Sequence, residues 1–166
     1  MKASRAVALS VLLFGGIALY AQSAGQKSFD TIKSLDGEWE GKNQMGDPVA
    51  VSYRLTAGGS ALLSEIKTEM KGHAEDMISM FNMDGNRLLL THYCAAGNQP
   101  RMQASISPDG KSITFDFVDA TNLTAHPGHM QRVVFTVIDA NHHIEEWHFA
   151  APGKEMVERF DLQKKS

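Results

Sequence analysis

Cysteine and runs of basic residues are the two features most clearly missing from the sequence. Cys94 is the only cysteine, so the chain cannot form an internal disulfide. Only Lys164 and Lys165 place two basic residues side by side. Surfaces that bind nucleic acid are rich in Lys and Arg, so this scarcity argues against nucleic acid as a partner.

Long apolar runs are confined to the N-terminus. Lys2 and Arg5 precede an apolar segment over 6–19, and alanine and serine are frequent over 18–24. This pattern is typical of a secretory signal peptide, and the apolar run is short for a membrane span. We expect a signal peptide over 1–24, cleaved somewhere within 21–24, and a secreted or periplasmic protein without stable membrane insertion after cleavage. A short N-terminal anchor is the alternative.

The charge balance of the expected mature chain is mildly acidic. Removing Lys2 and Arg5 leaves 14 of the 16 basic residues against 19 acidic ones, a formal net charge of −5. Its length suits one domain with a sizeable core, which we place at 25–166. The oligomeric state does not follow from the sequence.

After a short N-terminal helix that begins at Ser28, no helical pattern is long enough to connect parallel strands. Short alternating runs are instead joined by Gly, Pro, Asp and Asn turns, which indicates an antiparallel all-β fold. A sequential meander favours an up-and-down barrel of about ten strands over a sandwich. The expected strands cover 37–41, 49–55, 62–67, 77–83, 88–94, 102–106, 113–117, 133–137, 144–150 and 156–162.

The start and end of this meander resemble the lipocalin (calycin) barrels. A short helix precedes Gly37-Glu38-Trp39, and Arg159 lies in the last expected strand. In that family a tryptophan at the closed end packs under an arginine from the final strand. The resemblance therefore implies a structural contact between Trp39 and Arg159, with Gly37 opening the first strand.

The mature chain also resembles an uncharacterised family of secreted bacterial proteins with a lipocalin-like barrel. The residues that carry this resemblance are His92-Tyr93-Cys94, Gly97-Asn98-Gln99-Pro100-Arg101-Met102, His129-Met130 and Glu146-Trp147. No established activity comes with that family, so the resemblance bears on the fold.

The segment 91–102 holds the most unusual residues. His92 and Cys94 are two apart on a strand and therefore point to the same face, together with Leu88 and Leu90. We expect that face to be the lumen, with Gly97 to Pro100 shaping a corner and Arg101 available at the barrel mouth to hold a carboxylate. Inert burial of His92 and Cys94, and a surface position for Arg101, are the simpler alternatives.

A long irregular segment over 118–129 contains His126 and His129, and we expect it to close over the same mouth. Proximity of His92 and His129 is therefore a geometric prediction. On the strand 144–150, Trp147 shares a face with Glu145, and His148 shares the other face with Glu146. An inward Trp147 would form a ligand platform, although a plain core tryptophan is the simpler interpretation of the pattern.

Three functions are consistent with these residues. The first is a non-catalytic binding protein for a small hydrophobic or amphipathic ligand, with His92, Cys94, Arg101, His129 and Trp147 as candidate contacts. The second is a haem or divalent-metal site that uses His92, His129 or His148. The third is a small hydrolase or isomerase in which His92 activates Cys94, but no third orienting group is evident.

Overall fold

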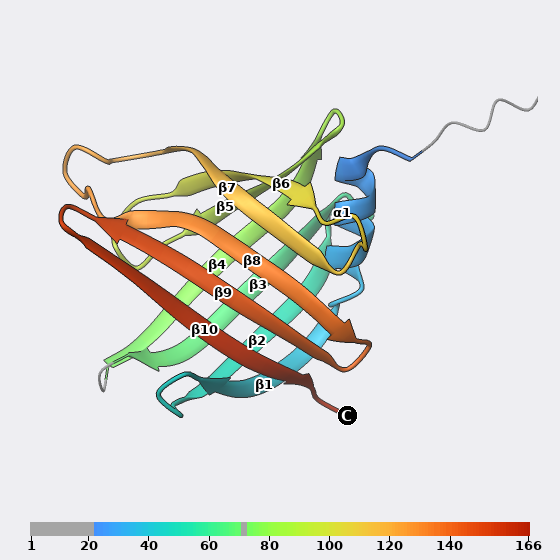
Figure 1. The fold of residues 1–166 in the computed structure, drawn as a ribbon, viewed down its shortest axis with the longest axis horizontal. Coiled ribbons are helices and arrows are strands. Elements are labelled where there is room, and N and C mark those ends of the chain that lie inside the picture. The colour runs from blue at the N-terminus through green and yellow to red at the C-terminus, as the bar shows by residue number, and fades with distance from the viewer. Residues whose placement is uncertain (1–21, 71–72) are drawn as a thin grey trace, which may run out of the picture.

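The computed structural model describes residues 22–70 and 73–166, and its ten strands close into one antiparallel barrel (Figure 1). Each strand pairs with its neighbours in the chain, and β1 also pairs with β10 to close the ring. The all-β barrel with a short N-terminal helix is therefore confirmed. The elements are α1 (Ala24–Lys33), β1 (Gly37–Asn43), β2 (Pro48–Thr56), the 3-10 turn η1 (Ala57–Gly59), β3 (Ala61–Met70), β4 (His73–Asp84), β5 (Arg87–Tyr93), β6 (Pro100–Ile106), β7 (Ser112–Ala120), β8 (His129–Asp139), β9 (His142–Ala151) and β10 (Lys154–Lys164).

The helix α1 lies against β4, β5 and β6 at one end of the barrel (Figure 1). It begins earlier than the sequence predicted: Ser23 caps it, and its hydroxyl accepts a hydrogen bond from the backbone N–H of Gln26 at 3.1 Å. Ser28 is instead buried inside the helix. A side chain at Gly25 would collide with the carbonyl of Asn86, so glycine permits this close contact with the β4–β5 turn.

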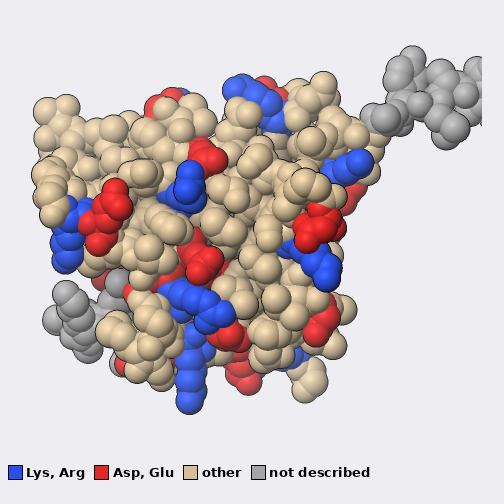
Figure 2. Space-filling view, viewed as in Figure 1, with Lys and Arg blue, Asp and Glu red and all other residues tan. Residues whose placement is uncertain are grey.

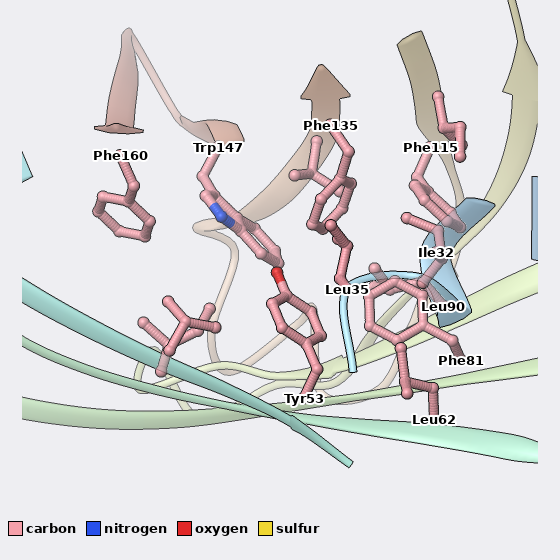
Figure 3. Close-up of a cluster of buried hydrophobic side chains, with 14 of the residues drawn as sticks. Ile32, Leu35, Tyr53, Leu62, Phe81, Leu90, Phe115, Phe135, Trp147 and Phe160 are labelled. Carbon is pink, nitrogen blue, oxygen red and sulfur yellow. The ribbon is translucent and has the colours of Figure 1, made fainter. Parts of the chain in front are cut away.

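The helix end of the lumen is filled by apolar side chains. Ile32 and Leu35, from the helix and the residues after it, are buried beside an aromatic trio from three strands (Figure 3). The rings of Phe81, Phe115 and Phe135 meet edge to face, with centroids 5.5 to 5.8 Å apart. Such pairs stabilise a core beyond simple burial. This end of the barrel is therefore closed.

The expected contact between Trp39 and Arg159 is wrong. Trp39 is buried, and its indole N–H donates to the carbonyl of Leu35 at 2.7 Å. The cation above its ring is Lys164, 5.5 Å from the centroid, because β1 and β10 pair in a register that sets Trp39 opposite Lys164. Arg159 has the opposite strand parity to the buried Phe160, so it faces outward and bonds to Asp161 at 3.4 Å.

The outer wall carries charges of both signs. On the face that Figure 2 shows, acidic and basic side chains are interspersed. Arg132 pairs with Asp116 at 2.7 Å between neighbouring strands, which is typical of this surface. Within the described residues, no helix has the length and apolar character needed to cross a bilayer.

Candidate functional site

The strand β9 presents polar groups to both sides of the wall, and its pairing decides which set is inside. His143, Glu145 and Trp147 are almost completely buried and point into the lumen. Glu146 and His148 occupy the alternate positions and face outward. His143 is thus a lumen residue, whereas its neighbour His142 is partly exposed and lies 2.9 Å from a carboxylate oxygen of Asp161.

At the end of the lumen opposite α1, the barrel contains a cavity of about 290 Å³. Most of its wall is apolar, and three methionines contribute to it. The aromatic residues Trp147 and Phe149 come from β9, and Phe160 comes from β10. The complete lining is Ile66, Glu75, Met77, His92, Cys94, Ala95, Ala96, Met130, Trp147, Phe149, Met156, Glu158 and Phe160.

His92 lies in the wall of this cavity and is completely buried, as its strand parity predicted. Its Nδ1 is 2.9 Å from the hydroxyl of Ser79 on β4, and its ring lies 4.8 Å from the ring of Trp147. Its Nε2 is buried and has no hydrogen-bond partner. Burial lowers the pKa of His92 from 6.5 to about 4, so the imidazole is neutral at physiological pH.

Cys94 lines the same cavity and is partly buried. Burial is the main cause that raises the pKa of its thiol, and the nearby charge of Glu75 adds to it. The backbone N–H of Ala96 donates to the sulfur at 3.5 Å, which works in the opposite direction. The thiol therefore stays protonated at neutral pH, unlike the thiolate of a cysteine nucleophile.

The corner over 94–99 is hydrogen-bonded to the long loop over 121–128. Asn98 is completely buried, and its side-chain N–H groups donate to the carbonyls of His126 at 2.9 Å and Gly128 at 2.7 Å. Gly97 adopts a positive φ of 87°, and a side chain there would press on the ring of His126. The segment 97–100 is thus a structural joint that fixes one side of the mouth.

Two of the candidate contacts lie away from the cavity. Arg101 points outward because it alternates with the buried Pro100 and Met102, and it forms a bidentate ion pair with Asp119 on β7. Its expected place at the mouth facing a ligand is therefore wrong. The ring of His129 packs against that of Phe117 with centroids 4.6 Å apart and planes tilted by 46°, and His129 is not among the residues that line the cavity.

The three histidines proposed for a metal or haem do not converge. His92 faces the lumen, whereas His148 lies on the outer wall. His92 contacts Ser79 and Trp147, while His129 contacts Phe117 and has its Nδ1 2.9 Å from the carbonyl of Pro127. Nowhere in 22–70 or 73–166 do three His, Cys, Asp or Glu side chains gather in a way that could hold a metal ion. His92 alone remains as a possible axial ligand.

A buried carboxylate beneath the cavity was missed from the sequence. Glu145 is completely buried and accepts hydrogen bonds from three donors: the hydroxyl of Tyr53, His143 Nε2 at 3.1 Å and the indole N–H of Trp147 at 2.8 Å. Figure 3 shows the hydroxyl of Tyr53 directed across the lumen toward Trp147. Burial, with Glu145 beside it, raises the pKa of Tyr53. The cluster fixes the orientation of Trp147, and the indole in turn forms part of the cavity wall.

Two further carboxylates, Glu75 and Glu158, line the cavity nearer the mouth. Glu158 lies opposite Trp147 in the β9–β10 pairing. Its Oε2 accepts a hydrogen bond from Gln44 at 3.0 Å, and its Oε1 is buried without a partner. Sequence reasoning missed both residues, although each shares the strand parity of an apolar lumen residue two positions away.

The comparisons with known proteins bear on the fold. No protein-family model matches the chain, and no curated protein matches it. Among solved structures, Rv2717c from M. tuberculosis is similar with a TM-score of 0.60 and 13% identity, over 84% of this chain and 98% of that one. A de novo designed fluorescence-activating β-barrel is also similar, with a TM-score of 0.40 and 8% identity over 82% and 98%. The closed barrel is thus shared with a natural protein, whereas membership of the lipocalin family stays a prediction.

Proposed function

We propose that this protein binds a small, largely apolar ligand in the cavity at the open end of its barrel. The observation that carries the proposal is His92 Nε2, a buried polar atom without a partner in the wall of a largely apolar cavity. Buried polar atoms in folded proteins almost always have a hydrogen-bond partner, because leaving one unpaired costs about 1–3 kcal/mol. A ligand with one hydrogen-bonding group would supply that partner.

The size and lining of the cavity support the same conclusion. A dry apolar cavity of roughly 150 Å³ is enough to hold benzene, and this one measures about 290 Å³. Trp147 and Phe149 offer flat aromatic surfaces, and Met77, Met130 and Met156 offer flexible ones that adapt to ligand shape. A few convergent polar groups in an apolar pocket are typical of small-molecule sites.

Binding accounts for His92 and Cys94 better than thiol catalysis does. A cysteine nucleophile needs a lowered thiol pKa and a base hydrogen-bonded to the thiol. Here burial raises the pKa of Cys94 and lowers that of His92, while the Nδ1 of His92 is directed to Ser79. Both residues therefore fit the role of neutral ligand contacts.

A fluorescence titration with N-phenyl-1-naphthylamine, an uncharged aromatic probe, tests the proposal. The wild-type protein should bind it saturably and with one site. Ala96→Phe, which fills the cavity, should weaken binding at least about tenfold, equivalent to about 1.4 kcal/mol. Ala50→Phe makes the same change at an exposed position and should leave binding unchanged. Absence of saturable binding, or equal binding by both variants, would overturn the proposal.

The same preparation tests haem. If His92 serves as an axial ligand, added haem should give a Soret band that His92→Gln abolishes. No such band is needed for the binding function proposed above, so this titration separates the two hypotheses.

We further propose that the protein is exported, as its N-terminal pattern indicates. The described helix begins at Ala24 with Ser23 as its cap, two residues after Ala21, where the expected cleavage range begins. Cleavage after Ala21 would retain that cap. N-terminal sequencing of the mature protein from the extracytoplasmic fraction tests both export and position, and recovery of the full-length chain in the cytoplasm would contradict the proposal.

A further inference from the structure

Among the described residues that line the cavity, none places a positive charge beside its carboxylates. Glu75 on β4 and Glu158 on β10 both contribute to the lining. Gln44 holds one oxygen of Glu158 and leaves Oε1 buried and unpaired. A buried carboxylate oxygen without a donor is costly, since it has lost its water and gained nothing in return.

Nothing else in the described wall neutralises these two groups. No Lys or Arg stands among the described residues that line the cavity. His92 is the only basic side chain in the described lining. Burial lowers its pKa to about 4, so it carries no charge at neutral pH. The cavity is therefore an apolar space with a negative potential at its mouth, and it would repel a fatty acid or another organic anion.

The aromatic side chains of the wall add to this preference. Trp147 lies opposite Glu158 across the β9–β10 pair, so one aromatic face and one carboxylate come from neighbouring positions in the wall. Phe149 and Phe160 lie on the same two strands. The face of an aromatic ring attracts a cation, most strongly when water is excluded.

Resting on the ligand-binding function proposed above, we infer that the ligand is an amphipathic organic cation, such as an alkyl or aryl amine. Its ammonium group would lie between Glu75 and Glu158 at the mouth. Its apolar body would extend into the lumen against Trp147 and the methionines, and a hydrogen-bonding group at its inner end would pair with His92 Nε2. A metal ion fits the site less well, because among the residues described no three His, Cys, Asp or Glu side chains converge.

Three ligands with one chain length and different head groups test the inference: octan-1-amine, octan-1-ol and octanoate. Isothermal titration of the full-length mature protein at pH 7 and low ionic strength should rank them amine, then alcohol, then carboxylate. The amine should bind at least about tenfold more tightly than octanoate. Equal or tighter binding of octanoate would overturn the inference, and if the alcohol still binds, the lumen-binding function survives. Binding of none of the three would overturn both.

Single substitutions locate the source of the preference. Glu158→Gln and Glu75→Gln should each reduce the amine-to-octanoate ratio severalfold while leaving the affinity for octan-1-ol nearly unchanged. Glu146→Gln makes the same chemical change on the outer wall of β9 and should leave the ratio as it is in the wild type. A ratio that is unaffected by both lumen substitutions, or reduced equally by the control, would overturn the assignment of the ammonium site.

Discussion

Replacing Glu145 by Gln probes the buried cluster with the smallest possible change in shape. The carboxylate accepts from Tyr53 and His143 through Oε1 and from Trp147 through Oε2. The amide of glutamine has one accepting oxygen and one donating NH₂ group, so one side must place a donor against a donor. In the orientation that disturbs least, the oxygen stays with Tyr53 and His143, and the NH₂ group faces the indole N–H of Trp147.

The expected destabilisation follows from that arrangement. One charge-assisted hydrogen bond is lost, at about 2 kcal/mol, and a buried N–H is left without an acceptor, at about 1–2 kcal/mol. The free energy of unfolding should therefore fall by about 3–4 kcal/mol. For a domain of this size that corresponds to a decrease in Tm of about 6–16 °C.

Urea unfolding followed by far-UV circular dichroism measures this change, with a lower midpoint and an unchanged slope. Glu146→Gln on the outer wall is the matched control and should change stability by less than about 0.5 kcal/mol. In a Trp147→Phe background, Glu145→Gln should cost about 3–4 kcal/mol less, because the lost hydrogen bond and the unpaired N–H both belong to the indole. Equal effects of Glu145→Gln and Glu146→Gln would refute the reasoning.

Three further predictions follow from the described contacts. Lys164→Ala removes the ammonium above the buried indole of Trp39 and should lower the free energy of unfolding by about 1–2 kcal/mol. Arg159→Ala on the outer wall should lower it by less than about 0.5 kcal/mol. Urea unfolding compares the two variants, and equal losses would contradict the contact between Trp39 and Lys164. Because the pKa of His92 is about 4 in the folded chain and 6.5 in its ordinary state, its contribution is fully present above pH 6.5 and is lost as the pH falls toward 4. Wild-type stability should therefore lose about 3 kcal/mol more than that of His92→Gln across this window, and parallel pH profiles would count against burial of the neutral ring. Burial raises the pKa of the Cys94 thiol above its ordinary value of 9.0, so its rate of reaction with iodoacetamide should still rise above pH 9.0 in the folded protein. If the pH midpoint of that rate is lower in the folded protein than in the urea-denatured chain, the prediction is wrong.

The sequence was sufficient for the architecture because strand alternation and turn residues are local signals. Leu88, Leu90 and His92 occupy every second position of one strand and therefore share a face, and all three are buried in the lumen. The sequential order of strands then left the up-and-down barrel as the simplest closure. The start of the helix was less well predicted, because both Ser23 and Ser28 are acceptable N-caps and local propensity does not choose between them.

The site was predicted only in part, because the decisive information is non-local. On β9 both faces carry a glutamate and a histidine, so polarity could not tell the inner set from the outer one. Trp147 and the apolar Phe149 are two positions apart on β9 and therefore share a face. The two aromatic side chains together were the available signal that this face points into the lumen. The apolar Phe160 likewise indicated that Arg159 points outward. The pairing of Trp39 with Lys164 depends on the register between the first and last strands, which no local pattern contains.

The apolar packing around Ile32 and Phe81 closes the helix end of the lumen, so among the described residues the way in lies at the opposite end, and this has a kinetic consequence. Whatever enters past the mouth must leave by the same route, so entry and exit share one transition state. A substitution that widens the mouth would therefore shorten the residence time of a bound ligand and speed its association together, leaving the equilibrium affinity largely unchanged. For any ligand that binds there, residence time can change without affinity.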